Sequence, residues 1–294
     1  MTPPRFKHFA AIDWSGAAGE RHAGIALALC DATSAPALVR PGHRWSRGEV
    51  LDWLEHALPP DTLVGFDMSM SFAFDDAGAY FPGWTASPAD ARRLWAVVEQ
   101  ICADEPHLGA TTFADHSGTA PHFRRPGGRA GAAFGGDGQT GGRGRFRQTE
   151  HAQARAGCRP YSNFNLVGAA QVGKGSLAGM RLLHRLHGKH AIWPFDPLPG
   201  SGSVLVEIYT TLAALAAGRS AARSKIRDHA ELNTALAGLG SKPVHGLGPI
   251  SDHAADALIS AAWLRNLAHQ PGIWSPPLLT PEIAQREGWT FGAR

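Results

Sequence analysis

The stretch from Phe9 to Gly16, with the sequence FAAIDWSG, constrains the fold more than any other part of the chain. Its apolar run is short and is followed by small, turn-forming residues, which favours a buried β-strand over a helix. The run ends in Asp13, and a carboxylate at the end of a buried strand is costly unless a cation or several hydrogen-bond donors accompany it. We therefore expect other parts of the chain to supply partners for Asp13.

The composition is that of a globular protein with a substantial core. The chain has 294 residues, of which 44% are hydrophobic and 18% charged, enough for one large domain or two small ones. A net charge of +3 permits a phosphate-bearing partner without requiring one. The three cysteines form no CxxC pair, which argues against a cysteine-based zinc site. The N-terminus lacks the apolar run of a signal peptide, and we find no run of membrane-spanning length. We therefore expect a cytoplasmic protein with no membrane partner.

The first part of the chain alternates between strand and helix signals. Residues 23–29 are spaced to form an antiparallel hairpin with the first strand, and residues 37–39 can supply a third strand. Residues 49–58 have helical spacing and are followed by two prolines. A second buried strand covers residues 62–67 and ends in Asp67. This order predicts a mixed α/β fold.

The later part of the chain predicts helices separated by one further strand. That strand spans residues 203–209 and carries Glu207 near its end. Helices are predicted for residues 89–103, 177–187, 212–217, 225–237 and 251–264. Either Ser251 or Asp252 can cap the last of them. The glycine-dense stretch 127–144 predicts a mobile loop, and the residues after Pro271 predict an irregular tail.

Five acidic residues stand at or near the ends of these elements, namely Asp13, Asp67, Glu207, Asp252 and Asp256. Singly, each has a structural explanation, because a strand-end Asp often bonds a turn and a helix-start Asp often serves as a cap. Glu207 is harder to explain in this way, since a lone buried glutamate is costly. Carboxylates that converge raise one another's pKa, and a cation between them relieves the repulsion. Ligands that are all oxygen favour Mg²⁺ or Mn²⁺ over zinc, and paired hard cations suit attack of water on a phosphodiester.

Other motifs carry weaker signals. The sequence Gly173–Ser176 resembles a phosphate loop, but Gly175 stands where Ser or Thr should follow Lys174. An anion-binding site at the start of the next predicted helix is the other interpretation of this motif. No G-x-S-x-G elbow supports a hydrolase triad. Trp14 and Trp84 could stack on bases, with core packing as the alternative.

The order of the acids resembles that of the RNase H-like nuclease fold, which has an Asp on its first strand, an acid on its fourth strand and further acids on a late helix. Ile12-Asp13 and Gly65-Phe66-Asp67 match the two strand positions, and His253–Leu258 resembles the last catalytic helix of Holliday-junction resolvases. More closely, the chain resembles a family of uncharacterised bacterial and archaeal proteins described as predicted RNase H-like nucleases. This likeness covers most of the chain and includes Arg147–Glu150, Asn165–Ala169, Val172–Met180, Ile192–Phe195 and Glu207–Tyr209. Thr210 stands where that family usually has proline, a difference that we expect to change the turn and not the chemistry.

The resemblance implies a single RNase H-like domain over residues 1–294, with a mixed sheet flanked by helices and a lid segment inserted at about residues 72–200. It implies a metal-dependent phosphodiester hydrolase that acts on nucleic acid, or on another phosphate-bearing substrate, with Mg²⁺ or Mn²⁺. The implied metal ligands are Asp13, Asp67, Glu207 and Asp256, with Asp252 as a further catalytic acid. Phosphates would meet Arg145, Arg147 and Lys174.

Two other functions remain open at the level of sequence. An ATPase or phosphotransferase of the actin-like type has the same strand order but normally contains two copies of the domain. A non-catalytic nucleic-acid-binding module is the other alternative. ATP binding without affinity for oligonucleotides would favour the former, and absence of metal binding would favour the latter.

Overall fold

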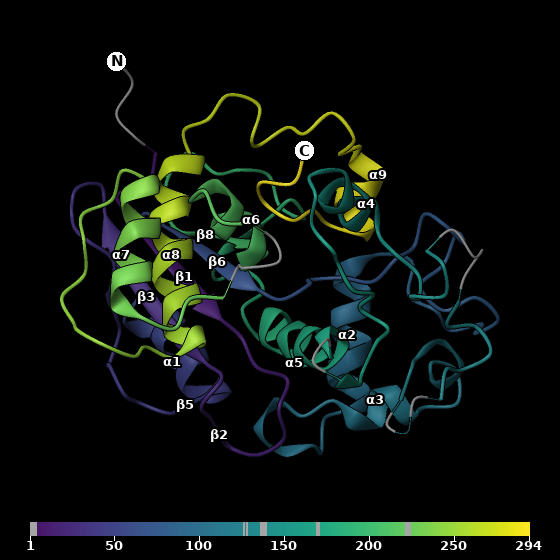
Figure 1. Ribbon diagram of the computed structural model, residues 1–294. Helices are drawn as coiled ribbons and strands as arrows, with labels where there is room; N and C mark the ends of the chain where they lie inside the picture. The colour runs from purple at the N-terminus through teal and green to yellow at the C-terminus, as the bar shows by residue number, and fades with distance from the viewer. Residues whose placement is uncertain (1–4, 126, 128, 136–139, 169–170, 221–224) are drawn as a thin grey trace.

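The computed structural model describes residues 5–125, 127, 129–135, 140–168, 171–220 and 225–294 (Figure 1). Its centre is a six-stranded mixed sheet with the strand order β4-β3-β1-β6-β8-β7. The strands are β1 (His8–Asp13), β3 (Ala26–Asp31), β4 (Ala37–Leu38), β6 (Thr62–Asp67), β7 (Ala191–Trp193) and β8 (Val204–Glu207). The α/β fold class predicted from the sequence is confirmed.

One strand of this sheet, β3, runs opposite to the other five. β3 runs antiparallel to both β1 and β4, so the predicted hairpin and third strand are confirmed. From β1 onward the neighbours β1, β6, β8 and β7 are all parallel. A separate two-stranded ribbon joins β2 (Arg21–His22) and β5 (Trp45–Ser46). The carboxyl ends of β1, β6 and β8 therefore meet at one edge of the sheet.

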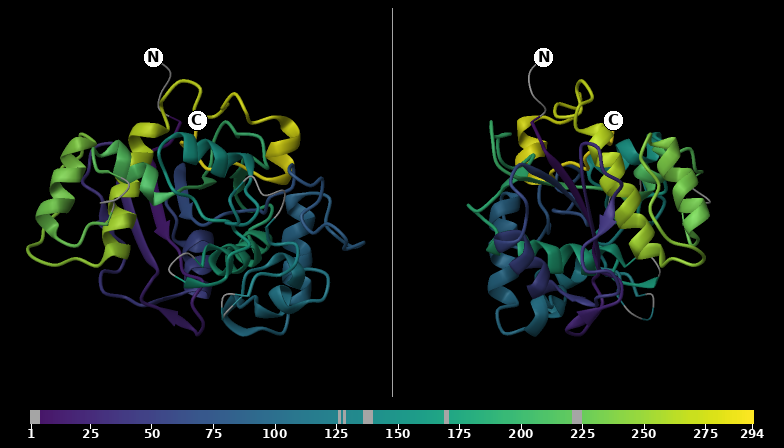
Figure 2. Two further views of the ribbon diagram at one scale, coloured as in Figure 1. Left: turned by 45° about the vertical axis from the view of Figure 1, so that its right-hand side comes forward. Right: turned by 90° about the vertical axis from the view of Figure 1, so that its left-hand side faces the viewer.

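Both faces of the sheet are covered by helices. Successive side chains of β1 point to opposite faces, so alternate residues of this strand belong to different cores. Phe9 and Ala11 belong to one core, which includes α6 (Thr210–Ala216), α7 (His229–Gly238) and α8 (Asp252–Leu267). Ala10 and Ile12 belong to the other core, with α1 (Arg47–His56), α2 (Ala91–Ile101) and α5 (Val172–Arg185). Figure 2 shows the two groups of helices on opposite sides of the strands.

Helix α8 packs directly on β1 and β3. Of the two candidate caps at its start, Ser251 serves, because its Oγ accepts a hydrogen bond from the backbone N–H of Ala254. The sequence of α8 after this cap is rich in alanine, and most of its residues are buried. Its first turn is thereby held at the edge of the sheet where β1 ends.

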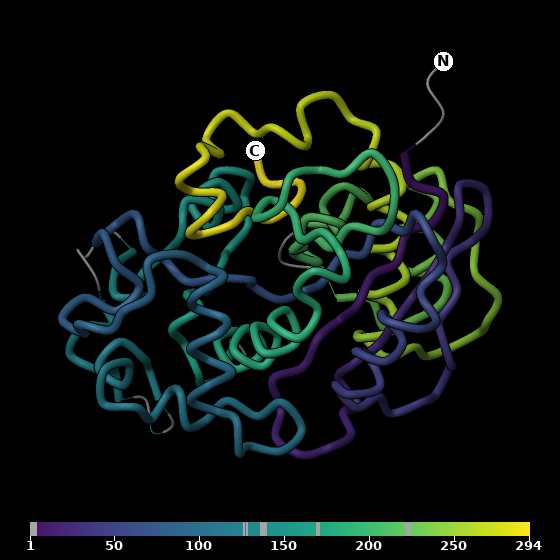
Figure 3. Tube along the Cα trace, turned by 180° about the vertical axis from the view of Figure 1, so that it is seen from behind, coloured from purple at the N-terminus to yellow at the C-terminus, as the bar shows by residue number. Residues whose placement is uncertain are grey.

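The segment between β6 and β8 contains most of the remaining elements, and Figure 3 shows much of it beside the sheet. These elements are α2, η1 (Pro106–Leu108), α3 (Thr111–Asp115), η2 (Ala120–His122), α4 (Gln148–Arg155), α5 and β7. A cluster of aromatic rings around Phe72, Phe81 and Phe164 holds it together. The predicted mobile loop includes residues 128 and 136–139, which lie outside the described residues.

The C-terminal part is more ordered than the predicted irregular tail. Thr280 caps a short helix, α9 (Pro281–Arg286). After it, the N–H of Phe291 donates to the carbonyl of Glu207 at 2.8 Å, and Trp289 and Phe291 are buried. Outside α9 these residues form turns and irregular chain, as predicted, but the prediction missed α9 and the burial of these two aromatic side chains against the sheet. In the ranges that the structure describes, no helix is both long and apolar enough to cross a membrane.

Candidate functional site

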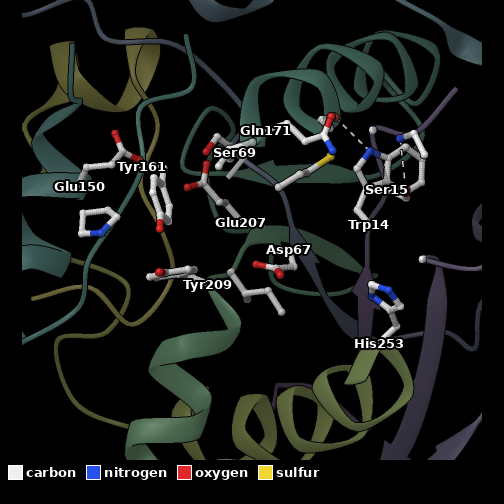
Figure 4. A pocket seen from close by; sticks show the side chains of 18 of the residues that line it. Trp14, Ser15, Asp67, Ser69, Glu150, Tyr161, Gln171, Glu207, Tyr209 and His253 are labelled. Atoms are coloured by element: carbon white, nitrogen blue, oxygen red, sulfur yellow. Dashed lines mark hydrogen bonds between the residues drawn. The ribbon is translucent and has the colours of Figure 1, made fainter. Parts of the chain in front are cut away.

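Two carboxylates meet where β1 and β6 end. The strands are parallel, and their register places Asp13 directly opposite Asp67. On the next strand Glu207 pairs with Phe66, one residue before Asp67. Asp67 and Glu207 both line a cavity of 360 Å³, shown in Figure 4. The strand-end signals thus identified side chains that lie at one edge of the sheet.

Asp13 is buried and has a histidine as its partner. The Nδ1 atom of His253, from the first turn of α8, lies 2.7 Å from Oδ2 of Asp13. Burial raises the pKa of the Asp13 carboxyl, and the contact with His253 opposes this rise. The same contact raises the pKa of His253. His253 also lines the cavity, so the Asp13–His253 pair extends from the end of β1 to the cavity.

Asp67 has only neutral partners. It accepts hydrogen bonds from the backbone N–H of Thr210 at 3.3 Å and from the Thr210 hydroxyl at 3.2 Å. Burial, together with the charges of Asp13 and Asp256, raises the pKa of Asp67 to about 8. No Lys, Arg or His within the described ranges forms an ion pair with Asp67. For this half-buried carboxylate, either a proton or a cation from outside the described residues would relieve the repulsion by the neighbouring acids.

The hydrogen bonds between Thr210 and Asp67 change the expectation that the residue at position 210 affects the turn alone. A proline at this position would have neither the N–H nor the hydroxyl that Asp67 accepts. The threonine thus affects a candidate site residue as well as the turn.

Asp256 and Asp252 lie near the start of α8 and share a lysine. The Nζ atom of Lys225 is 2.8 Å from Asp256 and 3.7 Å from Asp252. Burial raises the pKa of Asp256 to about 6, against the lowering effect of Lys225. Asp252 is more exposed than Asp256. The helix therefore brings one buried acid, Asp256, to the electrostatic neighbourhood of Asp13 and Asp67.

The buried acids Asp13 and Asp256 and the half-buried Asp67 suit a hard cation in their chemistry. All their donors are carboxylate oxygens, and Asp13 and Asp256 both raise the pKa of Asp67. Among the described residues, one lysine and one histidine pair with these carboxylates, and neither pairs with Asp67. In the described part of the chain, no three His, Cys, Asp or Glu side chains already stand in a metal-binding arrangement. Lys225 and His253 now occupy the carboxylates of Asp256 and Asp13, so a metal would have to compete with both.

Glu207 stands in a different environment. Its carboxylate accepts hydrogen bonds from Arg147 at 2.6 Å, from the backbone N–H of Met70 at 2.8 Å and from the hydroxyl of Thr290 at 2.5 Å. Arg147 is fully buried and also binds Glu150 at 2.6 Å. Both oxygens of Glu207 are thus engaged, and the cation Arg147 is among their donors, whereas the two oxygens of Asp67 accept from the neutral Thr210.

The predicted phosphate contacts of Arg145 and Arg147 are not supported by the geometry. The guanidinium of Arg147 donates to Glu150, Glu207 and the carbonyl of Glu287. Arg145 is also buried, and it binds Asp76 together with three backbone carbonyl oxygens of residues 73–80. Both side chains are held inside the protein because each neutralises a buried or half-buried acid.

Lys174 remains accessible but lines a neighbouring cavity. It lies in the first turn of α5, beside the loop that follows Asp13, and borders a second cavity of 560 Å³. A Cβ atom on Gly16 would collide with the backbone of Lys174 and Gly175, so this loop approaches the helix as closely as glycine allows. The indole N–H of Trp14 donates to the carbonyl of Gly175 at 3.0 Å. The side chain of Trp14 is therefore packed into the wall of the 360 Å³ cavity.

The structure adds site residues that sequence reasoning did not assign. His253 and Lys225 are the cationic partners of the acids, and Tyr161 stands at the cavity with an exposed ring. A signal for His253 existed, since it lies three residues before Asp256 and thus near it on the same helix. Neither Lys225 nor Tyr161 had such a spacing relation to the acids.

Comparison of the chain with protein-family models, with curated proteins and with solved structures gave no match. The functional argument therefore rests on the geometry of the acids and of the cavity beside them.

Proposed function

We propose that this protein is a metal-dependent phosphodiester hydrolase of the RNase H-like type, acting on nucleic acid. The observation that carries the proposal is Asp67, a half-buried carboxylate with no cationic partner among the described residues, set opposite Asp13 and near Asp256. The positions of the acids add support. Asp13 ends the first strand of the six-stranded sheet, Asp67 ends its fourth strand in chain order, and Asp256 lies on a late helix.

In this proposal Asp13, Asp67 and Asp256 hold Mg²⁺ or Mn²⁺, with Asp252 at the outer side. When bound between carboxylates, such ions activate water and stabilise the leaving oxygen in phosphodiester hydrolysis. Thr210 orients the carboxylate of Asp67 through its two hydrogen bonds. His253 keeps the carboxylate of Asp13 in place and, being half-exposed at the cavity, can exchange a proton with a bound phosphate ester.

The role of Glu207 is positional in this scheme. Because Arg147, Met70 and Thr290 engage its carboxylate, Glu207 ties β8 to the segment that forms the opposite wall of the cavity. Its position beside Asp67 keeps that wall at a constant distance from the acids. A ligand role for Glu207 would require release of these hydrogen bonds.

The test is cleavage of labelled single-stranded DNA and RNA in Mn²⁺ by the protein and by Asp13→Asn. We expect cleavage that EDTA abolishes and that Asp13→Asn reduces to background. Asp104→Asn, which removes an exposed carboxylate after α2, is the matched control and should cleave normally.

Metal binding is measured separately, by titration calorimetry and by thermal unfolding. Mn²⁺ at about 100 times its Kd should stabilise the protein by about 2.7 kcal/mol. This gain should vanish in Asp13→Asn. Unchanged cleavage by Asp13→Asn would contradict the role of Asp13, and absence of any Mn²⁺ binding would leave a non-catalytic binding module.

The actin-like alternative receives less support. The strands in the described ranges form one six-stranded sheet and one two-stranded ribbon, with no second copy of the larger sheet. ATP binding by calorimetry without oligonucleotide binding would reverse this preference.

A further inference from the structure

Tyr161 is an aromatic residue in an unusual position. Its side chain is 52% exposed, although large aromatic side chains in this protein are mostly buried. It lines the 360 Å³ cavity together with Asp67 and His253. In Figure 4 its ring stands on one side of the cavity, with Trp14 and His253 on the other side and Glu207 and Asp67 between.

The backbone around Tyr161 is anchored on both sides. The N–H of Cys158 donates to the carbonyl of Gln153, and the hydroxyl of Ser162 donates to the carbonyl of Arg145 at 2.7 Å. Ser162 and Asn163 are buried, and the amide of Asn163 donates to the carbonyl of Ser71 at 2.8 Å. The exposed ring is thus presented from a fixed stretch of chain, which lowers the entropy cost of binding a flat partner.

The cavity has the properties of a site for one nucleoside unit. Its 360 Å³ lies at the small end of the range for small-molecule pockets. An exposed tyrosine face offers stacking to any base, and Gln171 lines the same cavity, where its amide can bond a base edge. Asp67 lines the cavity between this ring and His253, so the phosphate of the same unit would lie beside Asp67.

We propose that this cavity takes one unpaired nucleoside unit, with its base stacked on Tyr161 and its phosphate directed toward Asp67 and Asp13. The placement of the phosphate rests on the proposed function, whereas the placement of the base rests on Tyr161 and the cavity. A base within a duplex is stacked and paired, so it must leave the helix to reach such a ring. The substrate is therefore a single strand or a locally unpaired region, rather than intact duplex.

The experiment measures binding by fluorescence anisotropy with Ca²⁺ present. The probes are labelled single strands of about 12 nucleotides, as DNA and as RNA, together with an abasic DNA strand of the same length and a DNA duplex. Tyr161→Leu removes the ring and Tyr161→Phe keeps it, and both changes are at an exposed position where folding should be preserved. Circular dichroism of each variant checks this.

We expect Tyr161→Leu to weaken binding of the base-bearing single strand about tenfold, and Tyr161→Phe to stay within about twofold of the parent. Neither variant should change the affinity for the abasic strand or the duplex. Equal affinity of Tyr161→Leu and the parent for the single strand would overturn the inference. The same conclusion would follow from an equal loss on the abasic strand, or from absence of binding to both DNA and RNA.

Cleavage of the abasic strand in Mn²⁺ separates this inference from the proposed function, because that strand contains phosphodiesters and no bases. Tyr161→Leu should retain this cleavage. If no cleavage of any strand occurs while binding still depends on Tyr161, the proposed function fails and the base site stands. If cleavage occurs and binding is independent of Tyr161, the base site fails and the proposed function stands.

Discussion

Asp13 and Asp67 lie directly opposite each other on the parallel strands β1 and β6, and the pKa of each carboxyl is raised. Asp13 has His253 as a partner, whereas the donors to Asp67 in the described part of the chain are the neutral groups of Thr210. This asymmetry between two adjacent acids makes the site sensitive both to pH and to added cations.

The stability of the metal-free protein should fall as pH rises between about 4 and 8. The pKa of Asp67 is raised to about 8 in the folded state from an ordinary value of 3.8. Within this window the folded protein holds a proton that the unfolded chain has lost, so the unfolding free energy decreases with pH. The contribution of one such group is at most about 1.4 kcal/mol per pH unit, and it ends above the folded pKa. Urea unfolding at several pH values measures this slope.

Asp67→Asn should remove this contribution to the slope, and Asp104→Asn should leave it in place. Mn²⁺ should also flatten the slope in the parent protein, because a bound cation favours the ionised carboxylate. The same slope in Asp67→Asn and in the parent would show that Asp67 does not hold the proton.

Lys225→Gln should tighten Mn²⁺ binding about tenfold, because removal of a positive charge 2.8 Å from Asp256 leaves more negative charge in the site. Calorimetric titration at constant ionic strength measures the change. Lys189→Gln, which breaks an ion pair with Glu55 away from the acids, is the control and should leave the affinity unchanged. Weaker binding by Lys225→Gln would mean that the lysine positions the acids instead of competing with the metal.

Arg147→Met should destabilise the protein by about 3–5 kcal/mol, because it leaves Glu150 and Glu207 buried without their cation. Arg155→Met, at the exposed end of α4, the helix that Arg147 precedes, should change stability by less than about 0.5 kcal/mol. Chemical denaturation of both variants measures the difference. A small effect of Arg147→Met, combined with a specific loss of oligonucleotide affinity, would restore the phosphate-binding role first expected for Arg147.

Gly16→Ala should lower cleavage activity more than it lowers stability. The added Cβ would meet the backbone of Lys174 and Gly175, so the loop after Asp13 would have to move away from α5. Gly48→Ala, whose Cβ would find only the Ser46 hydroxyl at 3.8 Å, should have no such effect. Initial rates in Mn²⁺ and thermal unfolding, measured on both variants, separate the two effects.

Local patterns predicted most of the framework. The alternating or continuous apolar runs located β1, β6 and β8, and helical spacing located α1, α2, α5 and α8 to within a few residues. These features depend on interactions between neighbours in the chain, which a sequence displays directly. The C-terminal part was missed because its order comes from the burial of Trp289 and Phe291 against distant strands.

By itself, the sequence determined that buried strands end in Asp13 and Asp67 and that a late helix begins with further acids. Only the tertiary structure decided which acids face one another and which are neutralised. The register of β1 against β6 places Asp13 opposite Asp67, and contacts across 240 positions of chain pair Asp13 with His253. Likewise, Arg147 and Glu207 are engaged with each other although either could have faced a ligand. The physical reason is that the cost of a buried charge depends on its partners in space, and sequence spacing does not specify those partners.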